Sequence, residues 1–190
     1  MVQAPQKAIT LAEFLRLPET KPASQYIDGQ INQKPMPQGK HSVLQGEIVA
    51  NFSRVLRPNR IAYAFPELRC TFGGRSIVPD VVVLLWANIP LDPNGEIANE
   101  VTQAPDWAIE VLSPNQSPTK VVKNLMHCLQ QGTQLGWLID PAEQTVFVYL
   151  PDQRVLVFDV AEQLLPVPAF ATDLQITVGE LFGWLKTFAP

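Results

Sequence analysis

Two acidic residues lie where apolar strands would otherwise run unbroken. Asp80 follows Pro79 and directly precedes the apolar run at 81–85, and Glu110 lies inside the apolar run at 107–112. An unpaired carboxylate that leaves water costs several kcal/mol or becomes protonated. A metal ion or a fixed cation removes this cost. If the two strands are neighbours, both carboxylates project from one end of a sheet toward one ion.

Position alone leaves other interpretations of the two acids open. Asp80 is as readily an ordinary acid at the edge of a strand as a ligand. Glu110 can instead pair with a buried arginine or lie on a wet face of a sheet. The alternation of a strand places Glu110 on the opposite face from Ile109 and Val111. The metal interpretation therefore depends on whether the strands of Asp80 and Glu110 are adjacent.

Two lysines fall on the helix expected after the Glu110 strand. Ser117 followed by Pro118 is typical of a helix start, Lys120 falls in the first turn, and Lys123 follows three residues later. The loop at 113–117 brings this helix back past the end of the strand. An ammonium group there can reach a phosphate that is held by an ion at the two acids. The alternative is a solvated surface lysine, the usual situation of this residue.

The elements that must position these residues follow from periodicity, capping signals and turn residues. Helices are expected over 10–17, 41–56, 118–131 and 177–185. Asp28-Gly29 is typical of a tight turn between two short strands. Further strands are expected over 62–65, 68–72, 81–86, 106–112, 136–139, 145–150 and 154–160. This order predicts a mixed α/β fold with a central sheet. We expect one domain over 1–190, with a helix and hairpin arm at 1–40 and a core at 41–190.

Composition excludes several classes of protein. The chain has 190 residues and a net charge of −4 from 14 basic and 18 acidic residues, which excludes a global electrostatic grip on nucleic acid but not a local basic patch. Cys70 and Cys128 are far apart, so a disulfide framework or zinc cluster is not expected. No signal peptide and no membrane span is expected. These features predict a cytoplasmic protein with reduced thiols.

Five segments of the chain carry a resemblance to a known family. They are Tyr26-Ile27-Asp28-Gly29, His41 at a helix start, Pro79-Asp80-Val81, Glu110-Val111-Leu112-Ser113-Pro114 and Gly136-Trp137-Leu138-Ile139-Asp140-Pro141. With them the chain resembles the Uma-type restriction endonucleases of the PD-(D/E)XK nuclease superfamily, a family long classed as a domain of unknown function. The resemblance covers about residues 10 to 185. It implies a restriction-endonuclease-like α/β fold, a mixed central sheet flanked by helices, and a divalent-metal nuclease site.

The resemblance also implies a ligand set. By position, Asp80 and Glu110 would bind Mg²⁺ or Mn²⁺, and the backbone carbonyl of Val111 would complete the protein's part of the shell. Mg²⁺ prefers oxygen ligands, takes few of them from the protein and keeps several waters. The ion would polarise the scissile phosphate and lower the pKa of a bound water.

The catalytic lysine departs from the pattern of the family. The superfamily places it two residues after the second acid, where this chain has Leu112, and the family often places it where this chain has Asn124. Lys120 lies one helical turn before Asn124, so it is our first candidate for the catalytic amine, and Lys123 is the second. Either would stabilise charge on phosphate oxygens or orient the attacking water.

Three further residues are candidates for supporting groups at the site. His41 can reach a phosphate or cap a helix start, although a structural role is the alternative. Glu47, on the same helix, can add an acid, although a solvated helix face is the alternative. Asn124 occupies the position at which relatives carry a lysine.

We therefore expect a cytoplasmic, magnesium-dependent endodeoxyribonuclease that hydrolyses the phosphodiester bonds of DNA, acts as a homodimer and has no membrane contact. The homodimer follows from the sparse charge and from the way in which such nucleases cut two strands. The alternative is a catalytically inactive nuclease-fold module that binds DNA or protein. Leu112 and Asn124 favour the module, whereas Asp80 together with a desolvated Glu110 favours the enzyme.

Overall fold

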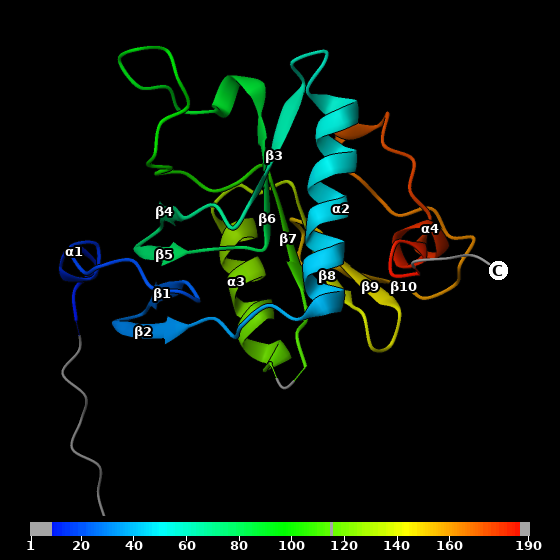
Figure 1. Ribbon diagram of the computed structural model, residues 1–190, viewed down its shortest axis with the longest axis horizontal. Coiled ribbons are helices and arrows are strands. Elements are labelled where there is room, and N and C mark those ends of the chain that lie inside the picture. Colours follow the sequence, from blue (N-terminus) through cyan, green and yellow to red (C-terminus); the bar gives the residue numbers. More distant parts are fainter. Residues whose placement is uncertain (1–8, 115, 187–190) are drawn as a thin grey trace, which may run out of the picture.

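A six-stranded mixed sheet forms the centre of the protein (Figure 1). The computed structural model describes residues 9–114 and 116–186. The strand order of this large sheet is β10-β9-β8-β7-β6-β3; β7 and β8 are parallel and the other neighbours are antiparallel. Its strands are β3 (Ala62–Pro66), β6 (Val81–Leu85), β7 (Trp107–Val111), β8 (Leu135–Asp140), β9 (Thr145–Tyr149) and β10 (Val155–Phe158).

A smaller antiparallel sheet of four strands, in the order β2-β1-β5-β4, lies beside the large one. Its strands are β1 (Ser24–Ile27), β2 (Gln30–Gln33), β4 (Cys70–Phe72) and β5 (Arg75–Ile77). Asp28 and Gly29 join β1 to β2 with φ angles of 49° and 83°. Two consecutive positive φ angles are typical of a type I′ turn, in which Asp-Gly is favoured because glycine adopts this conformation without strain. The hairpin expected at Asp28-Gly29 is therefore present.

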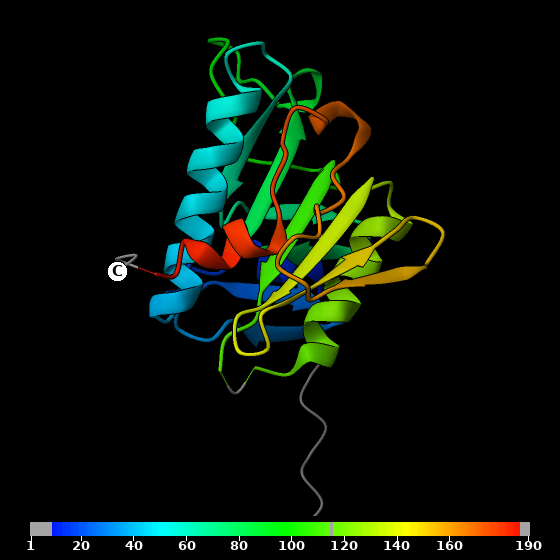
Figure 2. The same ribbon diagram turned by 90° about the vertical axis from the view of Figure 1, so that its right-hand side faces the viewer.

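Helices cover both faces of the large sheet (Figure 2). The long helix α2 (Gly39–Leu56) and the short helix α4 (Val178–Gly183) pack on one face, and α3 (Pro118–Gln130) packs on the other together with the small sheet. The remaining helical segments are α1 (Leu11–Phe14) and the two 3₁₀ turns η1 (Trp86–Asn88) and η2 (Ala169–Ala171).

Side-chain alternation divides the core between these two faces. Trp107, Ile109 and Val111 of β7 pack with α2 and α4, whereas Ala108 packs with α3. Because successive side chains of a strand point to opposite sides, Glu110 shares the α3 side with Ala108. The expected alternation along this strand is therefore confirmed, and it brings Glu110 to the face that carries the small sheet.

The structure confirms the expected fold class, a mixed sheet flanked by helices, and adds the second sheet. The predicted helices at 41–56 and 118–131 correspond to α2 and α3. The strand β5 was not predicted, because it has three residues and no measurable alternation. Cys70 and Cys128 are buried free thiols. None of the helices in the described ranges combines the length and the apolar character that a bilayer span requires.

Candidate active site

The structure brings Asp80 and Glu110 together. β6 and β7 are adjacent and antiparallel, with Val81 opposite Ile109, so Asp80, one residue before β6, is level with Glu110. The backbone N–H of Val111 donates to Asp80 Oδ2 at 2.7 Å. Asp80 and Glu110 are only 1% and 3% exposed. The predicted adjacency of the two strands is thus confirmed, and the two acids are buried at one place.

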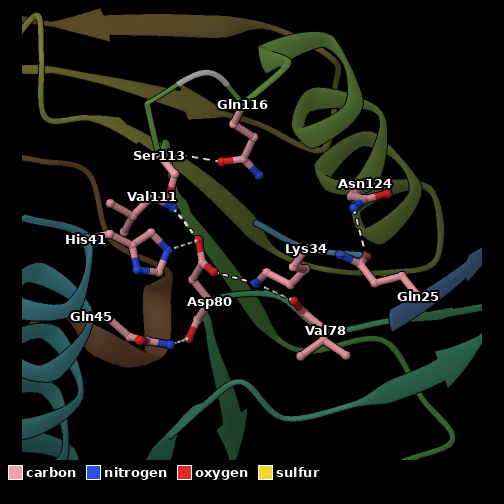
Figure 3. A network of polar contacts seen from close by, with 10 residues as sticks. All are labelled: Gln25, Lys34, His41, Gln45, Val78, Asp80, Val111, Ser113, Gln116 and Asn124. Atoms are coloured by element: carbon pink, nitrogen blue, oxygen red, sulfur yellow. Dashed lines mark hydrogen bonds and ion pairs between the residues drawn. The ribbon is translucent and has the colours of Figure 1, made fainter. Parts of the chain in front are cut away.

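Side chains from two other segments converge on Asp80 (Figure 3). The ammonium of Lys34 forms an ion pair with Asp80 Oδ1. His41 Nε2, in the first turn of α2, lies 3.1 Å from Asp80 Oδ2. Gln45, one turn further along α2, donates from Nε2 to the backbone carbonyl of Asp80 at 2.8 Å. The Asp80 carboxylate is therefore held on both of its oxygens.

Lys34 is the residue that the sequence analysis missed. It follows directly after β2, its side chain is buried, and its Nζ also donates to the backbone carbonyl of Val78 at 2.8 Å. An ammonium has three N–H donors, and Asp80 and Val78 take two of them. The sequence offered one weak signal, a lysine at the end of a strand predicted from its Asp-Gly turn. Nothing local pointed to a partner 46 residues further along the chain.

The charges of Lys34 and Asp80 stabilise one another. Burial alone would lower the pKa of Lys34, but the negative charges of Glu110 and Asp80 outweigh it and raise the pKa. Burial alone would raise the pKa of Asp80, but Lys34 and His41 outweigh it and hold the pKa well below its ordinary value. Asp80 is consequently ionised at neutral pH and Lys34 is protonated.

Glu110 has the opposite electrostatic situation. Burial raises its pKa well above the ordinary value, the negative charge of Asp80 raises it further, and Lys34 acts in the other direction. Lys34 is ion-paired with Asp80, and its positive charge does not offset the effects of burial and of the Asp80 charge on Glu110. An additional cation at this place would relieve the cost of ionising Glu110.

A cleft of about 720 Å³, which we name the hairpin cleft, lies between the β1–β2 hairpin and α3 and reaches Glu110 and Lys34. Lys120 and Lys123 line it from α3 and are exposed. They therefore lie in the same cleft as Glu110, but the amine that contacts Asp80 is Lys34 and not Lys120, our first candidate. The lining comprises Gln25, Ile27, Asp28, Gln30, Asn32, Gln33, Lys34, Pro35, Glu110, Gln116, Ser117, Lys120, Val121, Lys123 and Asn124.

The supporting candidates have different surroundings. Asn124 is buried in the hairpin cleft, where its Nδ2 donates to Gln25 Oε1 at 3.1 Å, and its Oδ1 has no partner among the described residues. Glu47 is exposed on α2 and accepts from Asn51 Nδ2 at 3.2 Å, so it does not reach the site. For Glu47 the structure shows the solvated helix face. His41, by contrast, lies directly at the site.

The donor set is suited to a hard divalent cation that takes few protein ligands. No group of three or more His, Cys, Asp or Glu side chains that could hold a metal lies together in the described ranges. The two carboxylates of Asp80 and Glu110 fit Mg²⁺, which usually keeps several waters. The raised pKa of Glu110 fits as well, since it marks a buried carboxyl that lacks a compensating charge. The metal-binding role of the Val111 carbonyl stays a prediction.

Comparisons with known proteins find a family model and a solved structure that are similar to this chain. A family model named Uma2 and described as "Putative restriction endonuclease" matches residues 11–179. The crystal structure of a protein described as "a putative nuclease belonging to DUF820", from Anabaena variabilis ATCC 29413, is 61% identical in sequence and superimposes with a TM-score of 0.92. That match covers 94% of this chain and 99% of the other. Among curated proteins, none matches the chain. The matched range includes both acids, Lys34 and the whole of α3, and the chain belongs to the Uma2 family.

Proposed function

We propose that the protein is a metal-dependent endonuclease that hydrolyses phosphodiester bonds of DNA at Asp80 and Glu110. One observation carries the proposal: two buried carboxyl groups lie level with one another on adjacent strands, Asp80 is ion-paired with the buried ammonium of Lys34, and a cleft reaches Glu110 and Lys34. The family description and the description of the 61% identical structure support the same class of reaction. Lys120 and Lys123, exposed in that cleft, supply positive charge for a polyanionic substrate.

Asp80 and Glu110 are the residues that would hold Mg²⁺ or Mn²⁺. When bound, the ion would polarise the scissile phosphate and lower the pKa of a water molecule. His41 and the Val111 amide fix the orientation of the Asp80 carboxylate through Oδ2. Oδ1, the other oxygen, contacts Lys34.

We assign to Lys34 the role of the catalytic amine that the sequence analysis placed on Lys120 or Lys123. Two N–H donors of Lys34 hold it against Asp80 and Val78, and the third remains for an oxygen of the phosphate. An ammonium that is held in place before the substrate arrives stabilises the charge that develops in the transition state, since no reorganisation is needed. Lys120 and Lys123 then bind phosphates at the rim.

Cleavage of supercoiled plasmid DNA tests the proposal. In the presence of Mg²⁺ or Mn²⁺ the unaltered protein should nick or linearise the plasmid, and EDTA should stop the reaction. Glu110→Gln keeps the size of the side chain and should lower the rate by at least about 100-fold. Glu47→Gln is the matched control, because Glu47 is an exposed acid outside the site, and it should cleave normally. Equal rates for Glu110→Gln and the unaltered protein would exclude the proposed site.

A second candidate function is the inactive nuclease-fold module. The observation that favours it is the Lys34–Asp80 ion pair, which compensates the Asp80 charge without a metal ion. Calorimetric titration with Mn²⁺ separates the two functions. The enzyme predicts binding that Asp80→Ala abolishes. Equal heats for the unaltered protein and Asp80→Ala, together with intact plasmid, would identify the module.

A further inference from the structure

We propose that the hairpin cleft binds a single strand of DNA, so that unpaired DNA rather than an intact duplex is the substrate. The cleavage of this strand rests on the proposed function, whereas its binding does not. The inference comes from three features of the cleft: the depth of the reacting groups, the balance of charge on its walls, and the amide groups that line it.

The reacting groups lie deep. Asp80, Glu110 and Lys34 are 1%, 3% and 9% exposed, and the cleft that reaches the last two holds about 720 Å³. Clefts of roughly 300–1,000 Å³ enclose a ligand of the size of a small molecule, which is the scale of one or two nucleotides. A duplex is too wide for such a space and would leave its phosphates at the rim. A single strand can bend inward and bring a phosphate to Lys34 and Glu110.

The charge of the cleft is positive even though the chain as a whole is acidic. Lys120 and Lys123 lie three residues apart on α3, so they are neighbours on one helix surface, and the buried Lys34 lines the same cleft. Of the two acids in the lining, Asp28 is paired with Arg75 through two hydrogen bonds of 3.0 and 2.7 Å. Three ammonium groups therefore line one cleft, two of them exposed and one buried, which suits a phosphate backbone that enters it.

The amide side chains that line the hairpin cleft can form hydrogen bonds with nucleobases. Six amide side chains face the cleft, and each offers both a donor and an acceptor, as the edges of bases do. Asn124 and Gln25 are the most buried of them, and Asn124 Oδ1, which has no partner within residues 9–114 and 116–186, adds an acceptor for a donor group of the ligand. In a duplex the Watson–Crick edges are already paired, so only an unpaired base can present that edge to these amides inside the cleft. The six residues are Gln25, Gln30, Asn32, Gln33, Gln116 and Asn124.

Fluorescence anisotropy in EDTA tests the inference without cleavage. The probes are a fluorescein-labelled DNA 12-mer of mixed sequence and the same 12-mer annealed to its complement. At about 0.15 M salt the single strand should bind at least about tenfold more tightly than the duplex. Lys120→Gln/Lys123→Gln should lower the slope of log K against log salt by about 1.4, since each phosphate contact on a single strand contributes roughly 0.7. Lys21→Gln/Lys186→Gln, which changes two exposed lysines outside the cleft, should keep the slope.

Three results would overturn the inference. They are equal or tighter binding of the duplex, an unchanged salt slope in the Lys120→Gln/Lys123→Gln protein, and tighter binding of an RNA 12-mer of the same sequence. Asn124→Leu provides a second measurement that leaves the charges intact, and it should weaken single-strand binding about fivefold. Unchanged single-strand binding in that protein would show that Asn124 does not contact the bases, and it would be a fourth result that overturns the inference.

The two proposals can fail separately. If the unaltered protein cleaves plasmid DNA but binds the single strand no better than the duplex, the inference about the substrate is wrong and the nuclease stands. If it binds the single strand selectively and Mn²⁺ produces no cleavage of either probe, the nuclease is wrong. The hairpin cleft is then the binding site of an inactive module.

Discussion

The two faces of the large sheet are built from the same strands but bury different chemistry. On the face covered by α2, Phe52, Trp107 and Trp137 pack against one another with ring centroids 4.8 to 5.9 Å apart. On the face covered by α3, the apolar cluster stops at Glu110 and Asn124, which are buried and polar. The α2 face therefore buries an aromatic cluster, whereas the α3 face also buries polar groups of the site, whose burial costs free energy.

The largest effect is expected on the α2 face. Trp107→Ala removes a fully buried ring from the aromatic cluster, and such truncations cost about 3–5 kcal/mol. Urea unfolding at neutral pH measures the loss. Trp86→Ala is the control, since Trp86 is 38% exposed and should cost less than half as much. Equal losses for the two proteins would contradict the assignment of stability to this face.

Breaking the Lys34–Asp80 ion pair should lower the free energy of unfolding nearly as much as Trp107→Ala does. Lys34→Met leaves the Asp80 carboxylate buried without its cation, and removal of one partner of a buried pair costs about 3 kcal/mol. In the plasmid assay the same protein should lose at least about 100-fold in rate. Lys120→Met and Lys123→Met change exposed lysines of the same cleft, so each should alter stability by less than about 0.5 kcal/mol. A folded Lys34→Met protein that cleaves normally would return the role of the amine to α3.

Glu110→Gln should have the opposite effect from the two preceding variants, because it should stabilise the metal-free protein. The pKa of Glu110 is raised on folding, so the native state binds more protons than the unfolded state above about pH 4.3. The free energy of unfolding therefore falls with rising pH, by up to about 1.4 kcal/mol per pH unit, until the pH exceeds the folded pKa. Glu110→Gln should remove this fall.

Unfolding curves at several pH values between 4 and 8, in EDTA, measure the effect. Glu47→Gln is again the control and should keep the slope of the unaltered protein. A slope that persists in Glu110→Gln would show that another group is responsible. Addition of Mn²⁺ should stabilise the unaltered protein and leave Glu110→Gln unchanged, since a ligand that binds only the native state stabilises it by mass action.

The sequence was informative where the signal is local. Alternation placed Glu110 opposite Ile109 and Val111, helical spacing located α2 and α3, and the adjacency of the two acid-bearing strands followed from one geometric assumption that the structure confirms. Alternation and helical spacing depend only on neighbours within one element, whereas the adjacency of the two strands had to be assumed.

Lys34 could not be found in the same way. It belongs to a segment rich in proline and polar residues, between β2 and α2, where no periodicity assigns a face. Its burial depends on the small sheet, which forms because β1 pairs with β5, a strand of three residues almost fifty positions away. The one hint in the sequence was that Leu112 and Asn124 stand where the pattern of the family has a lysine. A catalytic amine would then have to come from another segment.

Among the buried residues at the site, the smallest effect on stability is expected at Asn124, where two contributions oppose each other. Asn124→Leu removes a buried acceptor, Oδ1, that has no partner among the described residues, which should stabilise the protein. The same substitution also leaves Gln25 Oε1 without its donor, which should destabilise the protein by about 1–3 kcal/mol. The two contributions are of similar size. The net change in the free energy of unfolding should therefore stay within about 1 kcal/mol.

A double variant separates the two contributions. Replacing both partners of a buried hydrogen bond by apolar groups leaves nothing unpaired and is often neutral or stabilising. Gln25→Leu/Asn124→Leu should therefore be at least as stable as Asn124→Leu, as measured by urea unfolding, and should bind the single-stranded 12-mer more weakly than either single variant. If the double variant is instead less stable than both single variants, the amide pair serves the fold. The distinction between an α2 face that stabilises the protein and an α3 face that binds the ligand would then not hold at Asn124.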